Sequence, residues 1–276
     1  SVISGVVPQI SVIAGTCAGT AAMLACSSDF VIMTKESEFF MAPNSSSGSA
    51  EAAAKSGIAS AVCDDDKAAI EKARDLVNIL PVNNLAPVPM FEFAENSPVS
   101  GTDLKSIINS AADADSEIEI SAEFGNASYT GFVTIGGATA GIAAAGKEGS
   151  KLNSDDCAKL ARFMRTCDAF SIPVVTFVNS EGFEDADAVS SIKAMTTLAN
   201  SYSEATTVKI AVVTGKAVGP VFAAVAGNSS NSDFTYAYPD AVIAPVSSAA
   251  AVEFMWHDKL KGTDNLESAR NELISE

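Results

Sequence analysis

Two short glycine-containing segments are the parts of this chain whose residue types and spacing could do chemistry. Gly15-Thr16-Cys17-Ala18-Gly19 and Gly215-Lys216-Ala217-Val218-Gly219 each follow an apolar run and precede small residues. This pattern predicts a strand that turns directly into a helix, with unpaired backbone N–H groups at the helix N-terminus. Such donors can bind an anion, or an oxygen that becomes negative during a reaction. The candidate donors are Gly19 and Thr20 in the first segment, and Gly219 with its successors in the second.

Two other interpretations of these glycines remain open. Glycines at this spacing also let a helix pack closely on its strand without binding anything. The first segment further fits a nucleophile elbow with Cys17 as nucleophile, for which His257 is the only imidazole available as a base. A thiol that packs as a small hydrophobic residue explains Cys17 better, and His257 beside Trp256 fits a surface or packing residue. The hydrolase hypothesis predicts that Cys17→Ala abolishes turnover.

Charge and composition exclude several classes of partner and site. The 276 residues include 17 Lys and Arg against 34 Asp and Glu, so the formal net charge is −17, and we expect no nucleic-acid partner. One histidine excludes a mononuclear metal site with two imidazole ligands. The acidic run Asp64-Asp65-Asp66 fits a solvated helix cap, so we predict no metal in this chain. No stretch reaches the ~18 apolar residues that span a bilayer.

The cysteines favour a reducing compartment. They are odd in number, lack CxxC spacing and stand among apolar or helix-favouring residues: Cys17, Cys26, Cys63, Cys157 and Cys167. A disulfide framework or a zinc site would look different. No basic segment followed by an apolar core marks a signal peptide. We therefore expect reduced thiols in a cytoplasmic protein.

The elements that must position the two glycine segments alternate between strand and helix patterns, which is typical of an α/β protein. In the first part we expect strands at 9–14 and 29–33 and helices at 19–26, 51–60 and 66–80. In the second part we expect helices at 103–111, 153–170 and 185–204, a hairpin of 129–135 and 138–144 around Gly136-Gly137, strands at 173–178 and 208–213, and a helical tail at 248–274. One apolar helix face is predicted by the i, i+3, i+4, i+7 spacing of Leu160, Phe163, Met164 and Cys167.

A proline-rich stretch divides the chain. Residues 81–98 contain four prolines, which fix φ and remove backbone donors, so we expect an extended linker at 81–100. A loop of Ser, Gly and Asn is expected at 44–50. The linker separates a first domain, residues 1–80, from a second domain, residues 101–276.

The two parts repeat one pattern. Residues 10–19 align with 210–219 at an offset of 200, Ser28-Asp29-Phe30 aligns with Ser232-Asp233-Phe234 at 204, and residues 39–43 align with 241–245 at 202. Ordered matches of this kind indicate two copies of one unit. The second copy has a hairpin, a helix, a strand and a further helix before its glycine segment, whereas the first has only about nine residues there. We therefore expect the first copy to be incomplete on its N-terminal side.

These residues resemble a known family, the carboxyltransferase subunits of biotin-dependent acyl-CoA carboxylases and the related decarboxylase α subunits. Residues 4–11, SGVVPQIS, and 15–19, GTCAG, look like the family's N-domain strand and its CAGG turn. Residues 161–173, ARFMRTCDAFSIP, are similar to the family's ARFIRFCDAFNIP. Residues 202–206, 216–217 and 236–239 extend the resemblance over most of the chain.

The resemblance implies a crotonase-like fold, a ββα superhelix in two related domains, one for an acyl-CoA and the other for biotin on a separate carrier protein. It implies carboxyl transfer between carboxybiotin and the α-carbon of a short-chain acyl-CoA. The Gly19 and Thr20 amides match the family's oxyanion hole on the acyl-CoA side, and Gly219, Pro220 and Val221 match its Gly-Gly-Ala turn on the biotin side. Implied partners are a biotin carboxyl carrier protein, and a biotin carboxylase or membrane decarboxylase subunits, in a homo- or hetero-oligomer.

Two departures from the family pattern support an alternative. Thr20 replaces a glycine but keeps its N–H, whereas Pro220 has none, and a lost donor costs about 10²–10³ in rate where it is needed. We also expect the first copy to lack its N-terminal part, whose strands come from elsewhere or are absent from this sequence. The alternative is a catalytically weak CoA-binding or scaffold subunit that a partner chain completes.

Overall fold

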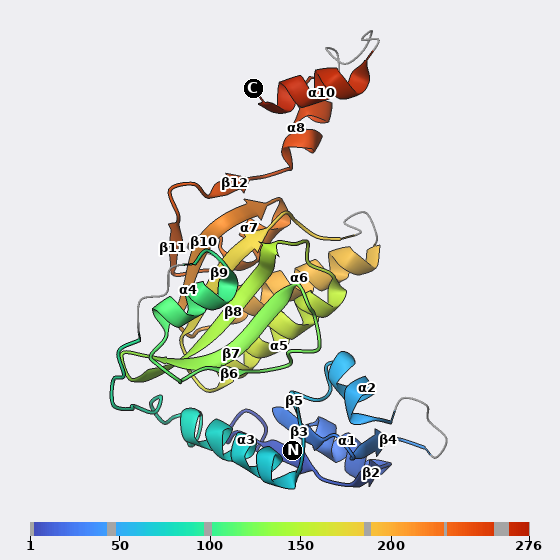
Figure 1. The fold of residues 1–276 in the computed structure, drawn as a ribbon, viewed down its shortest axis with the longest axis vertical. Coiled ribbons are helices and arrows are strands. Elements are labelled where there is room, and N and C mark those ends of the chain that lie inside the picture. Colours follow the sequence, from blue (N-terminus) through green and yellow to red (C-terminus); the bar gives the residue numbers. More distant parts are fainter. Residues whose placement is uncertain are drawn as a thin grey trace.

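The computed structural model describes residues 3–42, 48–96, 101–184, 189–228, 231–256 and 265–275. Figure 1 shows a small layer of N-terminal elements at one end, a larger sheet at the centre, and the last two helices beyond the sheet at the other end. Strands and helices alternate along the chain, which confirms the predicted α/β class.

The first copy is built on a parallel sheet in the order β1-β3-β5, with a separate parallel pair β2-β4. The strands are β1 (Ile10–Ile13), β2 (Thr16–Ala18), β3 (Phe30–Thr34), β4 (Glu38–Phe40) and β5 (Ala61–Cys63), and the helices are α1 (Thr20–Cys26), α2 (Ala50–Lys55) and α3 (Asp66–Ile79). The strands and helices predicted at 9–14, 19–26, 29–33 and 66–80 are confirmed. The helix predicted at 51–60 ends at Lys55, because the chain turns there into β5, and the three-residue strands β2, β4 and β5 were not predicted.

The second copy contains a sheet in the order β11-β10-β9-β8-β7-β6, with β12 beside the last part of β10. Its strands are β6 (Ile118–Glu119), β7 (Ser128–Ile135), β8 (Ala138–Gly149), β9 (Val174–Ser180), β10 (Lys209–Val218), β11 (Phe234–Ala237) and β12 (Val242–Ala244). Its helices are α4 (Leu104–Ala111), α5 (Ser154–Ala169), α6 (Val189–Glu204), α7 (Pro220–Val225), α8 (Ser248–Met255) and α10 (Leu266–Ser275). The pairs β8-β9, β9-β10 and β10-β11 are parallel, so their carboxyl ends share one edge of the sheet.

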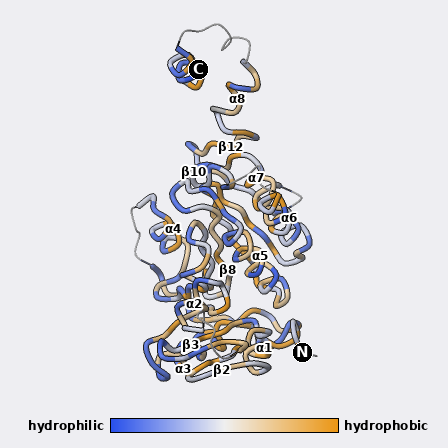
Figure 2. The backbone as a smooth tube through the Cα atoms, turned by 90° about the vertical axis from the view of Figure 1, so that its right-hand side faces the viewer, coloured by the Kyte–Doolittle hydropathy of each residue, from blue (hydrophilic) through white to orange (hydrophobic). Residues whose placement is uncertain are grey.

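Helices cover both faces of this sheet. On one face, α5 buries the predicted stripe of Leu160, Phe163, Met164 and Cys167, each at most 5% exposed, and packs beside α6. On the other face, Ile108 of α4 packs with Val133 and Phe177. Figure 2 shows the hydrophobic residues gathered in the central strands and hydrophilic residues on the outer turns of the helices. The predicted apolar face of α5 is confirmed.

Local signals in the sequence set the helix starts. The Asn153 side chain accepts from the N–H groups of Asp155 and Asp156, and the Asp156 side chain accepts from the Asn153 N–H, which is a capping box at the start of α5. Asp65 caps α3 by accepting from the Ala68 N–H at 2.8 Å. The acidic run at 64–66 is thus a helix cap, as predicted.

The predicted hairpin is confirmed by the antiparallel pair β7-β8, which turns at Gly136 and Gly137 with φ of 59° and 81°. The buried carboxylate of Asp113 holds this turn. It accepts from the Gly136 N–H at 2.9 Å, the Gly137 N–H at 2.7 Å and the Thr134 hydroxyl at 2.8 Å. Residues on two separate elements therefore fix one turn, and no local sequence signal marks this contact.

The remaining predictions on organisation have mixed outcomes. The described part of the linker, residues 81–96, contains no helix, and Met90 forms an isolated bridge to Ala138. The helical tail predicted at 248–274 comprises α8 and α10, and residues 257–264 between them lie outside the described residues. Most of the loop predicted at 44–50 also lies outside the described residues, although α2 already begins at Ala50. The domain boundaries at 80 and 101 stay a prediction.

Candidate functional site

The two glycine segments adopt the same turn. Gly19 precedes α1 with φ 60° and ψ −130°, and Gly219 precedes α7 with φ 65° and ψ −141°. Positive φ is a conformation that glycine adopts at little cost. Both glycines therefore let a strand pass into a helix without an intervening loop, as the sequence predicts.

The strands that carry these turns repeat the same contacts. Ile10 of β1 is paired with Phe30 of β3, and Ile210 of β10 is paired with Phe234 of β11, both in parallel. The Gln9 N–H donates to Asp29 Oδ2 at 2.8 Å, and the Lys209 N–H donates to Asp233 Oδ2 at 2.7 Å. The predicted repeat is thus present in the hydrogen bonds as well as in the sequence.

One part of the predicted alignment is wrong. Phe40 is paired with Ala18 and Ala244 with Val218, so the last strand of the unit repeats at an offset of 204. The sequence alignment at an offset of 202 matched Ala42 with Ala244 on letters alone. The strand register follows from backbone pairing, and the side chains of these three-residue strands are too few to reveal that register in the sequence.

The glycine N–H groups are not free, which corrects the prediction for Gly19 and Gly219. The Gly19 N–H donates to the Phe40 carbonyl at 2.9 Å, and the Gly219 N–H donates to the Ala244 carbonyl at 2.8 Å. Each glycine is the last residue that pairs with the neighbouring short strand. The N–H groups available for a ligand therefore begin one residue later.

Thr20 is the first residue of α1, and no described residue accepts from its N–H. At the matching position of α7, Pro220 has no N–H to offer. Val221 follows it, and among the described residues none accepts from the Val221 N–H. Of the five predicted site residues, Thr20 is thus the one that presents an accessible backbone donor, because Val221 is 0% exposed.

The surroundings of the two turns differ. The first turn is open, because Thr20 is exposed and a side chain on Gly19 would meet only the Met41 carbonyl, at 4.0 Å. The second turn adjoins a cavity of about 350 Å³ between α6 and α7. This cavity is lined by Met195, Thr196, Ala199, Asn200, Ser203, Pro220, Ala223, Ala224 and Asn231.

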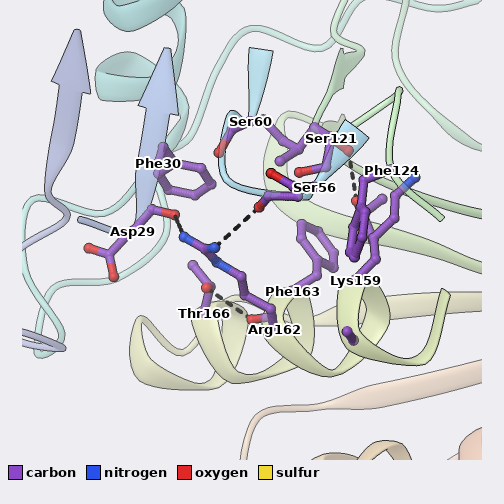
Figure 3. A pocket seen from close by; sticks show the side chains of 14 residues that line it. Asp29, Phe30, Ser56, Ser60, Ser121, Phe124, Lys159, Arg162, Phe163 and Thr166 are labelled. Atoms are coloured by element: carbon purple, nitrogen blue, oxygen red, sulfur yellow. Dashed lines mark hydrogen bonds between the residues drawn. The ribbon is translucent and has the colours of Figure 1, made fainter. Parts of the chain in front are cut away.

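A further pocket, of about 200 Å³, lies where the first copy meets α5 (Figure 3). Figure 3 shows the Arg162 side chain directed at the first copy, and its guanidinium donates to the carbonyls of Ser28 and Asp29, each at 3.3 Å. The rings of Phe30 and Phe132 are 5.9 Å apart in an edge-to-face arrangement, and Phe163 packs on Phe132 at 5.2 Å. The segment 161–173, which carries the most specific resemblance, thus joins the two copies through packing.

Lys159 lies one turn before Arg162 and is 4% exposed. Its ammonium donates to the carbonyls of Ser128 at 3.0 Å and Gly125 at 3.4 Å. Burial lowers the pKa of Lys159 to about 8, and repulsion from Lys147 adds to this effect. Its hydrogen bonds go to backbone oxygens and not toward either glycine turn, so Lys159 belongs to the scaffold.

The hydrolase hypothesis gains no support. Cys17 is half-buried in β2 opposite Phe39, and His257 lies outside the described residues. All five cysteines are free thiols, as predicted. Burial raises the pKa of Cys157 to about 12.

In the described ranges, no three His, Cys, Asp or Glu side chains gather as metal ligands. No described helix has the length and apolarity of a membrane span.

Sequence reasoning missed the Phe40 and Ala244 carbonyls that bind the glycine amides. Both lie in three-residue strands, too short for a periodic pattern. If the two copies had been aligned on Ser28-Asp29-Phe30 and Ser232-Asp233-Phe234, the offset of 204 would have matched Phe40 with Ala244 correctly.

Comparisons with known proteins agree with the geometry. The model of the carboxyl transferase domain family matches residues 1–276. The propionyl-CoA carboxylase beta chain of Cereibacter sphaeroides is 30% identical over 98% of this chain and 59% of its own length. The methylmalonyl-CoA decarboxylase subunit alpha of Propionigenium modestum is 29% identical over 100% of this chain and 60% of its own length. The chain therefore spans less than two thirds of these relatives.

A solved structure gives the same result for the fold. The transcarboxylase 12S structure, described as a hexamer with methylmalonyl-coenzyme A and methylmalonic acid bound, superposes with a TM-score of 0.88 at 30% identity. The superposition covers 99% of this chain and 59% of that one. The fold is thus the α/β fold of a crotonase-like carboxyltransferase half.

Proposed function

Since the chain belongs to the carboxyl transferase domain family, we propose that it transfers a carboxyl group between carboxybiotin, held on a separate carrier protein, and the α-carbon of a short-chain acyl-CoA. In the carboxylation direction the N–carboxyl bond of biotin breaks, the α-carbon loses a proton, and a carbon–carbon bond forms. Negative charge develops on the thioester oxygen and on the ureido oxygen of biotin. The reaction therefore needs hydrogen-bond donors aimed at two oxygens.

The observation that carries this proposal is the unpaired Thr20 N–H at an open turn. The Gly19–Phe40 hydrogen bond fixes the turn, and the Thr20 N–H follows it at the N-terminal, positive end of α1. We assign the Thr20 N–H as the hydrogen-bond donor to the thioester oxygen, and Gly19 as the residue whose lack of a side chain lets the thioester approach the turn closely. At the second turn we propose the N–H of Val221, a residue that is buried in this structure, as the donor to the biotin oxygen, with Gly219 and Pro220 forming the turn before it. Such a site works without a histidine pair.

We further propose that the chain folds as two related copies of a ββα superhelix, of which the first accepts elements from another polypeptide segment. In the described residues β1 pairs only with β3, whereas its counterpart β10 pairs with both β11 and β9. Leu24 of α1 is 61% exposed, whereas its counterpart Ala224 is 3% exposed, in the helix that packs beside α6. A strand beside β1 and a helix on α1 would cover both surfaces. A biotin carboxyl carrier protein, and a biotin carboxylase or membrane decarboxylase subunits, complete the proposed assembly.

A proline substitution tests the central donor. Thr20→Pro removes the N–H but suits the backbone, because Pro220 occupies the matching position after a glycine of the same conformation. Thr20→Ala is the matched control, since it removes the same side chain and keeps the N–H. The assay follows label from [¹⁴C]carboxybiotin into acetyl-, propionyl- and butyryl-CoA, in the complete protein with its carrier. We expect Thr20→Pro to lower kcat by about 10²–10³ and Thr20→Ala to stay within a fewfold of wild type.

Two results would count against the proposal. Equal activity of the two folded variants would remove the role of the Thr20 N–H. A wild-type complex that binds acyl-CoA but transfers no label would favour the scaffold alternative, for which Pro220 is the motivating residue. Circular dichroism and thermal melts of each variant confirm that the fold is retained.

A further inference from the structure

Asn179 lies at the carboxyl end of β9, between two bulges. On the β8 side, Val178 is paired with Ala145 and Ser180 with Gly149, so three residues of β8 lie opposite Asn179. The β10 side has the same arrangement, because Val178 is paired with Val213 and Ser180 with Ala217. Each neighbouring strand thus bends away from β9 at this one residue.

Contacts on the β10 side are close and polar. Asn179 Oδ1 accepts from the Lys216 N–H at 3.0 Å. A side chain on Gly215 would come within 2.4 Å of Asn179 Oδ1, and one on Gly146 within 2.2 Å of the Asn179 carbonyl. Gly146 also has φ of 90°. A side chain on Gly146 would meet the Asn179 backbone, whereas one on Gly215 would displace the Asn179 side chain, so the amide of Asn179 fills the space on the β10 side.

This amide determines where β10 continues. Beyond the bulge, Lys216 is paired with Val242 and Val218 with Ala244, and the strand ends at Gly219. The Lys216 N–H is the backbone group that ties the bulge back to β9. A second link, between the Lys216 ammonium and Glu181 at 2.5 Å, is half-exposed and contributes little.

The first copy has no such support. Gly15 matches Gly215 in the repeat, yet nothing lies within 4 Å of a side chain placed on it. The described residues place no strand on that side of β1. Among the described residues, the contact of Asn179 is therefore seen at the second glycine turn and not at the first.

We propose that Asn179 is a positioning residue for the biotin side of the reaction: its side-chain oxygen holds the β10 bulge and so sets the place of the segment Lys216–Val218 and of the turn that follows. The proposal rests on the proposed function. It assigns Asn179 no contact with either substrate, and it predicts an effect on transfer from biotin that leaves acyl-CoA binding unchanged.

The test compares Asn179→Ala, which removes the acceptor, with Asn179→Asp, which keeps it. Displacement of a reacting group by about 1 Å costs on the order of 10²-fold in rate. We expect Asn179→Ala to lose 10- to 10²-fold in kcat/KM for carboxybiotin, with the KM for acyl-CoA unchanged, and Asn179→Asp to recover most of the loss. Asn78→Ala, an exposed asparagine of α3, is the control for a generic substitution.

Hydrogen exchange at the Lys216 amide gives a readout that does not need turnover. It should be faster in Asn179→Ala and close to wild type in Asn179→Asp. If the wild type transfers no label, the proposed function fails while this exchange still tests the role of Asn179. Unchanged exchange, full activity of Asn179→Ala, or equal loss on the acyl-CoA side would overturn the inference. If Asn179→Ala does not fold, Gly215→Ala takes its place in the exchange and activity measurements, because the added methyl group displaces the same Asn179 amide.

Discussion

The Gly19 amide donates to the Phe40 carbonyl at 2.9 Å, and this hydrogen bond decides which N–H groups the turn can offer. Because it recurs between Gly219 and Ala244 at 2.8 Å, it belongs to the repeated unit and is no accident of one copy. The bond anchors the strand end, so the first outward donor is the next residue. That position is Thr20 in one copy and Pro220, which has no N–H, in the other, and the two turns therefore offer different backbone donors.

This inequality predicts a gain of function. Pro220→Thr copies the residue that follows Gly19 and adds an N–H at the first position of α7. If a donor at this position helps to stabilise charge on biotin, kcat for label transfer should rise by about tenfold or more. Pro220→Val, which adds the same N–H with a different side chain, should give a similar increase. No change in either variant would contradict a role for a donor at this position.

A matched pair of glycine substitutions compares the two copies in stability. Gly215→Ala places a methyl group 2.4 Å from Asn179 Oδ1, whereas Gly15→Ala points into open space. Overpacking of this kind costs about 1–3 kcal/mol. We expect Gly215→Ala to lower the free energy of unfolding by that amount and Gly15→Ala to leave it nearly unchanged, as measured by urea denaturation. Similar losses in both would contradict the packing described around Asn179.

The sequence predicted features that local patterns or a repeated pattern mark. The hairpin follows from Gly136-Gly137, the face of α5 from the spacing of Leu160 and Met164, and the repeat from ordered matches. It did not predict the Gly19–Phe40 hydrogen bond, because the partners are far apart in the chain and the acceptor strand has three residues. Asn179 was missed for the same reason, since its role comes from bulges in two neighbouring strands.

The Asp113 carboxylate should support stability in a pH-dependent way. Burial alone would raise its pKa, but hydrogen bonds from the Gly137 N–H, the Thr134 hydroxyl and the Gly136 N–H outweigh this and hold the pKa below its usual range. A lowered pKa in the folded state adds stability above the unfolded pKa of about 4, and this stability is lost as the pH falls through the folded pKa.

Asp113→Asn should therefore destabilise the protein by about 1–3 kcal/mol at pH 7, because an amide cannot accept at both positions. The difference from wild type should shrink as the pH falls below about 4. Urea denaturation at pH 7, 5, 4 and 3 measures both effects, with the exposed Asp75→Asn of α3 as control. A difference that stays constant over this range would show that the charge of Asp113 is not what holds the hairpin turn.

Lys159 should also make stability rise with pH, but in a window at high pH. Its pKa is lowered from 10.5 to about 8, chiefly by burial and then by repulsion from Lys147. Between pH 8 and 10.5 the folded chain therefore binds fewer protons at this group than the unfolded chain, and stability rises with pH in this window. Below pH 8 the amine is charged in both states, and the full cost of burying the charge is present.

Lys159→Met removes this titration while keeping a long side chain in the same space. Relative to that variant, the wild-type free energy of unfolding should gain up to about 3 kcal/mol between pH 7.5 and 10.5, since one pKa unit corresponds to about 1.4 kcal/mol. The comparison cancels the tyrosines and cysteines that titrate in the same range. Lys159→Arg, which stays charged at every pH tested, should show no such gain. A wild-type curve parallel to that of Lys159→Met would mean that water reaches the ammonium and that its pKa is close to normal.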